Sequence, residues 1–328
     1  MSGLLKHKIH WWRLRTEWYR KKLVLSQPPY FINLEPTGFC NLRCTVCSYQ
    51  QNRGKGYMKM ELAEKAIEEA ARLGVSQIRF YLAGEPLFHP HLDEMIMLAR
   101  SHGMLTQVHT NATILDEKRS AKLLNSGLNS ISFSFDGENA EDYEAIRIGS
   151  KFEDTLQNII SFLTMKKERG LSNPFVTFQV IKPYRSGSPF VPKISDEFKQ
   201  RLDGLPIDRF LVLYPFSWPG QDTKEFVRPT GKRYFPCPVL WQSLSVGWDG
   251  KILGCCGDLN GVVILGEVQT DRFMDVWNGK PLVAMRRLHV LGRHESIPLC
   301  RDCDAVYVRV HPFIRDIRDL LTGKWTPL

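Results

Sequence analysis

Strand-like and helix-like segments alternate along residues 30–214 of this 328-residue chain. Short apolar runs of strand length are each followed by a longer run with helical periodicity. This alternation predicts an α/β fold with a parallel sheet, either an open doubly wound sheet or a partial barrel. In both, functional groups gather at the carboxyl ends of the strands. The predicted strands are 30–34, 77–82, 105–109, 130–135, 175–181 and 210–214, and the predicted helices are 61–73, 92–102, 117–125, 152–167 and 196–202.

The composition is that of an ordinary globular protein, with 43% hydrophobic and 24% charged residues. The chain has no apolar run long enough to span a membrane. Its first residues are charged and lack the apolar core of a signal peptide. We therefore expect a cytoplasmic protein, in which disulfide bonds are improbable.

Most of the net charge of +9 lies in residues 1–22, where seven basic side chains accompany one acid, Glu17, and only +3 remains elsewhere. Trp11, Leu14 and Trp18 recur near helical spacing, so residues 1–28 are predicted to form an amphipathic, basic arm. Its apolar stripe either packs on the parent domain or makes weak contact with an anionic membrane surface. Because the rest of the chain is nearly neutral, no nucleic-acid partner is expected.

The eight cysteines form two groups separated by a long cysteine-free stretch. The first group, Cys40, Cys44 and Cys47, has the spacing C-x3-C-x2-C directly after the first predicted strand. Three thiolates on one loop can bind three corners of a 4Fe-4S cluster and leave the fourth iron open for chemistry. A zinc site is the alternative, but zinc prefers four ligands in paired arrangements.

Polar turns follow the next predicted strands. Gly84 and Glu85 come after the second, Asn111 after the third, and Ser134 and Asp136 at the end of the fourth. The carboxyl ends of parallel strands share one edge of a sheet, so these residues are expected to meet the three cysteines there. Taken singly, each is also a common turn former.

With these motifs, residues 30–215 resemble the radical S-adenosylmethionine (radical SAM) enzymes. The resemblance implies a partial (β/α)6 TIM-like barrel and a 4Fe-4S cluster whose open iron binds S-adenosylmethionine. It assigns the cluster to Cys40, Cys44 and Cys47, and contacts with S-adenosylmethionine to Gly84, Glu85, Asn111, Ser134, Asp136, Arg147 and Gln179. The charges fit independently, since Glu85 can pair with an ammonium and Arg147 with a carboxylate.

The second cysteine group begins after a Pro- and Gly-rich stretch that marks a predicted domain boundary. A hairpin turning at Asp249 and Gly250 would bring Cys237 and Cys255 together. This region resembles the C-terminal SPASM/twitch domain, which implies one auxiliary 4Fe-4S cluster bound by Cys237, Cys255, Cys300 and Cys303. A zinc ribbon is the alternative. The predicted divisions are 1–28 for the arm, 29–217 for the barrel, 230–310 for the iron-sulfur domain and 311–328 for the tail.

Two further residues are candidates for catalysis. Cys256 is either a packed thiol or a hydrogen-atom donor to a substrate radical, and Asp258 is either a turn residue or a proton acceptor.

The resemblance implies reductive cleavage of S-adenosylmethionine to a 5′-deoxyadenosyl radical, with an electron supplied by a donor such as flavodoxin or ferredoxin. We expect hydrogen abstraction from a small polar substrate, such as a sugar or aminocyclitol, followed by oxidation or epimerisation. Peptide modification is the alternative within the family, disfavoured because the arm is too short for a leader-peptide domain. The alternatives outside it are an iron-sulfur electron carrier and a zinc-dependent nucleic-acid-binding protein.

Overall fold

The computed structural model describes residues 3–49, 53–182, 193–213, 233–308 and 311–321. Its centre is a nine-stranded sheet with the order β10-β9-β8-β1-β2-β3-β4-β5-β6. Six of these strands, β1 to β6, are parallel neighbours and form the predicted partial barrel. Their bounds are β1 Phe31–Leu34, β2 Gln77–Phe80, β3 Leu105–Thr110, β4 Ser130–Ser134, β5 Phe175–Ile181 and β6 Arg209–Leu213.

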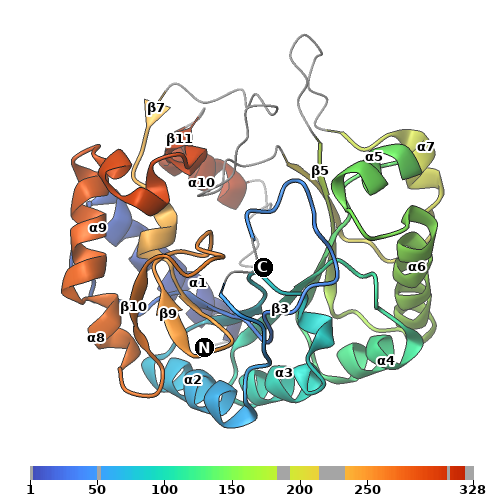
Figure 1. Cartoon of the computed structure of the whole chain (residues 1–328), viewed down its shortest axis with the longest axis horizontal. Helices are drawn as coiled ribbons and strands as arrows, with labels where there is room; N and C mark the ends of the chain where they lie inside the picture. The colour runs from blue at the N-terminus through green and yellow to red at the C-terminus, as the bar shows by residue number, and fades with distance from the viewer. Residues whose placement is uncertain (1–2, 50–52, 183–192, 214–232, 309–310, 322–328) are drawn as a thin grey trace.

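The crossover helices lie on the outer side of the strands (Figure 1). Several begin where the sequence provides a capping side chain: Asp116 accepts from the Arg119 amide at 2.7 Å, and Ser195 accepts from the Phe198 amide at 3.2 Å. The first crossover helix ends at Gly74, which takes a φ of 78°. The bounds are α2 Met60–Leu73, α3 Leu92–Ser101, α4 Glu117–Asn125, α5 Ala140–Ile146, α6 Phe152–Glu168 and α7 Asp196–Gln200.

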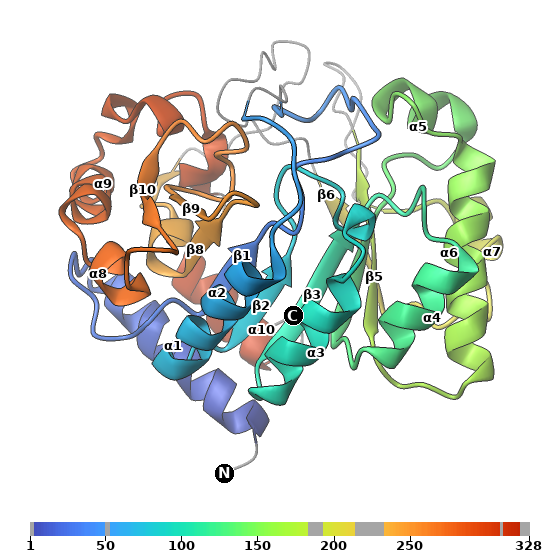
Figure 2. The same ribbon diagram turned by 60° about the horizontal axis from the view of Figure 1, so that its bottom comes forward.

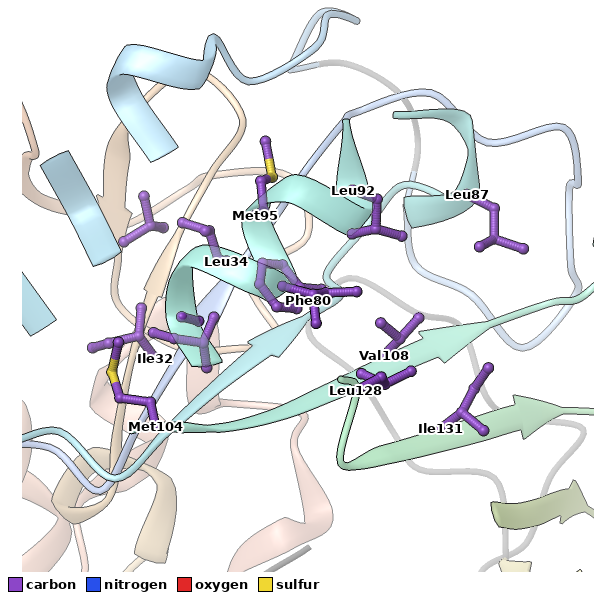
Figure 3. Packing of buried hydrophobic residues seen from close by; sticks show 14 of the residues in the cluster. Ile32, Leu34, Phe80, Leu87, Leu92, Met95, Met104, Val108, Leu128 and Ile131 are labelled. Carbon is purple, nitrogen blue, oxygen red and sulfur yellow. The ribbon is translucent and has the colours of Figure 1, made fainter. Parts of the chain in front are cut away.

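The two faces of the sheet differ in chemistry. Outward side chains such as Phe80, Val108 and Ile131 are fully buried beneath the helices, where they pack with Leu92 and Met95 of α3 (Figure 3). The alternate positions of the same strands face the barrel interior and are mostly polar. The hydrophobic core therefore lies outside the strands, and the inner face is left for polar groups.

The second cysteine group lies in a region that continues the barrel sheet. Strand β8 pairs in parallel with β1, with Asn33 opposite Ser245, and the β8–β9 hairpin turns at Gly250, whose φ is 86°. One sheet thus crosses the predicted boundary between barrel and iron-sulfur domain (Figure 2). The elements are β7 Arg233–Tyr234, β8 Ser243–Val246, β9 Lys251–Leu253, β10 Ile264–Glu267, β11 Tyr307–Val308, α8 Phe273–Trp277 and α9 Lys280–Val290. Short 3-10 turns occur at Pro86–Phe88, Pro238–Trp241, His294–Ser296, Pro298–Cys300 and Asp304–Val306.

The predicted N-terminal arm forms helix α1 (Gly3–Tyr19), which packs against the protein. Leu14 and Trp18 of its apolar stripe are buried, and the Trp18 indole donates to the Pro236 carbonyl at 3.1 Å. Arg15, counted from the sequence among the basic groups of the arm, is buried in an ion pair with Asp316 of helix α10 (Pro312–Leu321). The stripe thus follows the packing alternative. Within the described ranges, no helix has both the length and the apolar character needed to cross a bilayer.

Candidate active site

The three cysteines of the first group line one cavity. Strand β1 leads into the loop that carries Cys40, Cys44 and Cys47, and this loop is held by backbone bonds from Arg43 to Ile148 and from Thr45 to Ile146, both at 3.0 Å. The cavity has a volume of about 370 Å³. Burial raises the pKa of all three thiols, that of Cys40 to about 12. Neighbouring thiols add to this effect at Cys40 and Cys47, whereas Arg147 opposes it at Cys44. A group that stabilises thiolates is therefore needed for these sulfurs to become ligands.

Two predicted contacts of S-adenosylmethionine reach the thiols. The Arg147 guanidinium lies 3.6 Å from Cys44 Sγ, and the side-chain nitrogen Nδ2 of Asn111 lies 4.0 Å from Cys40 Sγ. Arg147 also forms a buried ion pair with Asp136, whose other oxygen accepts from the Ile181 amide at 2.7 Å. Burial alone would lower the pKa of Arg147, but Asp136 and the Cys44 thiol outweigh it and raise that pKa. Arg147 is thus a permanent cation beside the cysteine loop.

Glu85 is held by neighbouring strand ends. Its carboxylate accepts hydrogen bonds from Thr110 Oγ1 at 2.6 Å, from the backbone amide of Asn111 at 2.7 Å and from the backbone amide of Leu87 at 3.1 Å. Burial raises its pKa to about 6 despite these donors. Beside it, Gly84 passes so close to Thr37 that an added Cβ would lie 1.9 Å from the Thr37 carbonyl oxygen, so only glycine fits. The turn therefore has a fixed backbone and a carboxylate that a bound ammonium would stabilise as an anion.

Ser134 and Gln179 occupy neighbouring inward positions. They are opposite one another in the register of β4 and β5, at the carboxyl ends of both strands. Both keep some accessible surface, unlike the fully buried outward residues Phe133 and Phe178. The structure therefore brings Glu85, Asn111, Ser134, Asp136, Arg147 and Gln179 to the edge that carries the first three cysteines.

Below this edge, the barrel interior contains polar residues that were not among the predicted site residues. Arg79 and Tyr81 come from β2 and the residue after it, and the Tyr81 ring lies 4.6 Å from the His109 ring. Arg209 of β6 donates to Thr177 Oγ1 at 3.0 Å. Arg79, Tyr81 and His109 could have been found from the sequence, because each alternates with apolar residues of a predicted strand, whereas Arg209 lies one residue before the predicted strand 210–214.

The second cysteine group is also assembled. Burial and the nearby thiols of Cys300 and Cys303 raise the pKa of Cys237, and burial raises that of Cys300 to about 12. The Gly257 amide donates to Cys255 Sγ at 3.3 Å, a contact suited to a ligated thiolate. The hydrogen bond with the Cys256 thiol raises the pKa of Cys255, burial and the Cys237 thiol add to this effect, and the Gly257 amide opposes it.

The two candidate catalytic residues have different surroundings. Cys256 hydrogen-bonds Cys255 and Tyr81, and these bonds lower its pKa. Its thiol therefore touches a residue of the barrel interior. Asp258 is buried and accepts from the Val262 and Val263 amides at 2.7 and 2.8 Å. These contacts match the turn-residue alternative for Asp258.

The hairpin between β8 and β9 contacts the first cysteine loop. Trp248 fills a cradle of three glycines in that loop, since a Cβ added at Gly56 would lie 2.2 Å from its ring and one at Gly38 would lie 2.7 Å from its indole nitrogen. The Trp248 amide donates to Glu35 at 3.0 Å, and Glu35 forms a buried ion pair with Arg53. The contact of Trp248 with Glu35 was not predictable from the sequence, because the two residues lie about two hundred positions apart in the chain.

The donor set fits iron-sulfur clusters. The first site supplies three thiols from one loop around one cavity, and the second supplies four thiols from three segments. Within the described residues, no group of three or more His, Cys, Asp or Glu side chains is arranged to hold a single metal ion. Three thiols, a neighbouring fixed cation and a buried carboxylate are the groups that a cluster with an amino-acid ligand requires.

Comparison with known proteins identifies the class. The Radical SAM superfamily matches residues 34–180, and an iron-sulfur cluster-binding domain (SPASM) matches residues 237–304. The chain is therefore a radical SAM protein with a C-terminal SPASM domain. These domains imply a 4Fe-4S cluster, S-adenosylmethionine and auxiliary iron-sulfur ligation, as expected from the resemblance.

Individual relatives are more distant. The PqqA peptide cyclase of Granulibacter bethesdensis is 32% identical over 122 residues, which are 37% of this chain and 32% of that protein. The match thus spans about a third of the length of this relative. Among solved structures, BtrN in complex with AdoMet and 2-DOIA has a TM-score of 0.60 at 18% identity, covering 87% of this chain and 97% of BtrN. Streptococcus suis SuiB bound to precursor peptide SuiA has a TM-score of 0.64 at 15% identity, covering 89% and 73%. At these identities the two structures establish the fold alone.

Proposed function

We propose that this protein is a radical SAM enzyme that removes a hydrogen atom from a small polar substrate held inside the barrel. The observation that carries the proposal is the single cavity lined by Cys40, Cys44 and Cys47 at the strand edge above a polar barrel interior. A reduced 4Fe-4S cluster bound there together with S-adenosylmethionine would supply the radical chemistry that removes hydrogen from unactivated carbon.

The residues of the chain would bind and orient these groups. The thiols of Cys40, Cys44 and Cys47 would ligate three irons. Arg147, held by Asp136, would place a cation beside the carboxylate of S-adenosylmethionine, and Glu85 would accept from its amino group. Ser134, Gln179 and Asn111 would hydrogen-bond the remaining polar groups from the inner edge of the barrel.

The second site would hold one auxiliary 4Fe-4S cluster through Cys237, Cys255, Cys300 and Cys303. With four cysteine ligands and no open iron, this site suits electron transfer or structural support. A one-electron donor of the flavodoxin or ferredoxin type would supply the cluster that binds S-adenosylmethionine.

Small polar substrates are favoured by the polar inner face of the barrel. Asn33, Gln107, Ser132 and Thr177 all occupy inward positions between β1 and β5. The 2-DOIA complex of BtrN involves a small molecule, and we extend the same substrate class to this chain. Peptide modification is the second candidate, supported by the peptide-bound SuiB complex and by the similarity to a peptide cyclase.

Two outcomes are possible for the substrate radical. Loss of an electron to the auxiliary cluster and of a proton would give oxidation, whereas return of a hydrogen atom to the other face would give epimerisation. The contact of Cys256 with Tyr81 supports Cys256 as the hydrogen-atom donor for epimerisation. Asp258, whose carboxylate already accepts two amides, is better placed to stabilise the loop than to take a proton from substrate.

The test is formation of 5′-deoxyadenosine by the anaerobically reconstituted and reduced protein. Wild-type protein should form it from S-adenosylmethionine, and Cys44→Ala should form none because a cluster ligand is missing. Cys237→Ala should keep this cleavage but lose product formation from substrate. Cleavage that persists in Cys44→Ala would contradict the assignment of the site.

A further inference from the structure

Helix α1 has a second apolar strip, which the fold leaves partly exposed. Leu14 and Trp18, on its inner side, are buried against the protein. Leu5, Ile9 and Trp12 are four and three residues apart, so they lie in a strip along a different side of the helix. Leu5 is 45% exposed, and Ile9 and Trp12 are half-buried. The fold therefore uses one apolar side of α1 for packing and presents the other outward.

A line of cations runs beside this outward strip. Lys6, Arg13 and Arg20 are spaced seven residues apart, which places them one above another along α1, and all three are exposed. The helical pattern reaches Arg20, because its amide donates to the Thr16 carbonyl at 3.0 Å. In the described part of the chain, none of these three cations forms an ion pair.

The acid of this segment does not neutralise the line of cations. Glu17 is buried, and its carboxylate accepts hydrogen bonds from the Ser26 amide at 3.1 Å and the Ser26 hydroxyl at 2.8 Å. Lys22 also pairs with Glu17, at 3.1 Å, whereas Lys21 is exposed. The outward face of α1 therefore combines apolar and basic side chains without an acid of its own helix.

Helix α10 extends the apolar strip. Trp12 and Tyr19 are seven residues apart and share one line on α1, and the Phe313 ring packs edge-on against the Tyr19 ring with 5.4 Å between their centroids. Phe313 and its neighbour Ile314 are 48% and 60% exposed, and Val24, just beyond the end of α1, is 62% exposed. The ribbon of α1 lies at the outer edge of the molecule (Figure 2). Exposed apolar side chains bordered by cations are typical of an interaction surface.

We propose that this face of α1 and α10 binds the surface of an anionic lipid bilayer. The apolar strip would enter the boundary between headgroups and acyl chains, while Lys6, Arg13 and Arg20 contact the anionic headgroups. Helix α1 would thus lie in the plane of the surface. A nucleic acid fits this face less well, because it would contact the cations and leave apolar side chains such as Leu5 and Ile314 in water. The inference is independent of the proposed function, since none of these residues belongs to the candidate active site.

Flotation of the full chain with lipid vesicles tests this inference. Vesicles of phosphatidylcholine alone are compared with vesicles in which about one third of the lipid is phosphatidylserine. Wild type should bind the anionic vesicles more tightly, and added salt should weaken this binding. The triple variant Lys6→Gln, Arg13→Gln and Arg20→Gln should bind them about a hundredfold more weakly, because each cation near the surface contributes about fivefold.

Two further variants separate the parts of the surface. The triple variant Lys118→Gln, Lys167→Gln and Arg169→Gln removes the same charge from exposed positions in and beside α4 and α6. Its vesicle binding should stay within about twofold of wild type, because these positions do not contact the lipid. Leu5→Gln combined with Ile314→Gln should weaken binding even at high salt, because it removes apolar contacts that salt does not screen. Circular dichroism should show the wild-type helix content in all three variants, since every changed side chain is exposed.

The outcomes that overturn the inference are distinct. Wild type that does not bind the anionic vesicles removes the proposed surface. Equal weakening in the two triple variants would show that net charge alone attracts the protein, and would also overturn it. Binding of the RNA homopolymer poly(U) without binding of vesicles would assign the cations of α1 to a nucleic acid instead.

Discussion

Glu85 shows how a single residue can serve both the fold and the site. Its carboxylate ties the turn after β2 to Thr110 and Asn111 at the end of β3, and burial raises its pKa. Desolvation therefore destabilises the charged form of Glu85 as long as no cation is bound beside it. An ammonium bound there would restore the ordinary ionisation of the group.

This environment predicts a pH dependence of stability. An acid whose pKa rises from 4.5 to about 6 on folding takes up a proton as the chain folds. The contribution of Glu85 is therefore complete below pH 4.5 and is lost as the pH rises through 6, amounting to about 2 kcal/mol. Urea unfolding of cofactor-free protein at several pH values should show this loss in wild type. The difference in free energy between wild type and Glu85→Gln should vary over the same range, and a constant difference would refute the prediction.

The residues of the site were predictable from the sequence where they belong to a recognisable motif. Cys40, Cys44, Cys47, Gly84 and Glu85 follow strand ends that periodicity reveals, and the structure places them at one edge. The contact of Arg147 with Cys44 was not predictable, because it joins residues about one hundred positions apart in the chain.

Among the secondary-structure elements, the β8–β9 hairpin of the second domain supports the first cysteine loop. Trp248 of the hairpin packs against Gly38, Gly54 and Gly56, and Asn260 in the following loop between β9 and β10 donates to the Ser48 carbonyl at 2.9 Å. The loop that would hold the catalytic cluster is thus held in turn by the auxiliary domain.

Removing this support should affect one site and spare the other. In Trp248→Ala, we expect loss of most of the roughly four irons of the three-cysteine site, with the four-cysteine site still loaded. Gly56→Ala should have the same effect, since its Cβ would clash with Trp248. Iron content and electron paramagnetic resonance before and after addition of S-adenosylmethionine measure both sites. Trp12→Ala on α1 is the control, and equal iron loss from both sites would count against a specific supporting role.

The elements themselves were largely predictable. The predicted strand 175–181 and helix 117–125 match β5 and α4, because long alternating or helical patterns between turn residues leave few choices. Helix α5 was missed, since its seven residues are too few to show a period. The sequence signal that could have revealed it is Asn139, because asparagine often caps the start of a helix. In the structure the Asp142 amide donates to the Asn139 side chain at 2.9 Å.

At the scale of the whole molecule, both ends of the described chain meet beside the auxiliary domain. Arg15 of α1 pairs with Asp316 of α10, and Trp18 packs against Phe235, two residues before Cys237. Arg286 of α9 donates to the carbonyls of Leu23, Leu240 and Trp277. The basic N-terminal segment therefore stabilises the domain that carries the second cysteine group.

The Arg15–Asp316 pair should be strongly coupled. Arg15→Met alone should lower the free energy of unfolding by about 3 kcal/mol, because it leaves a buried carboxylate without its partner. The double variant with Asp316→Leu should recover much of the loss. Denaturant unfolding of the four proteins of this cycle measures the coupling, and additive effects would contradict it.

The continuous sheet was not predictable from the sequence. Strand β8 pairs with β1 across more than two hundred intervening residues, whereas the Pro- and Gly-rich stretch between them suggested a domain boundary. Local patterns identify strands and turns, but they carry no information on which distant strands become neighbours.

On the structure described above, the chain should hold two iron-sulfur clusters in distinct cysteine sites. The most direct measurement is the content of iron, sulfide and zinc in protein purified and reconstituted without oxygen, in wild type and in Cys44→Ala and Cys300→Ala. We expect about eight irons and eight sulfides per wild-type chain and about four of each in either variant. Zinc in place of iron at both sites would contradict it.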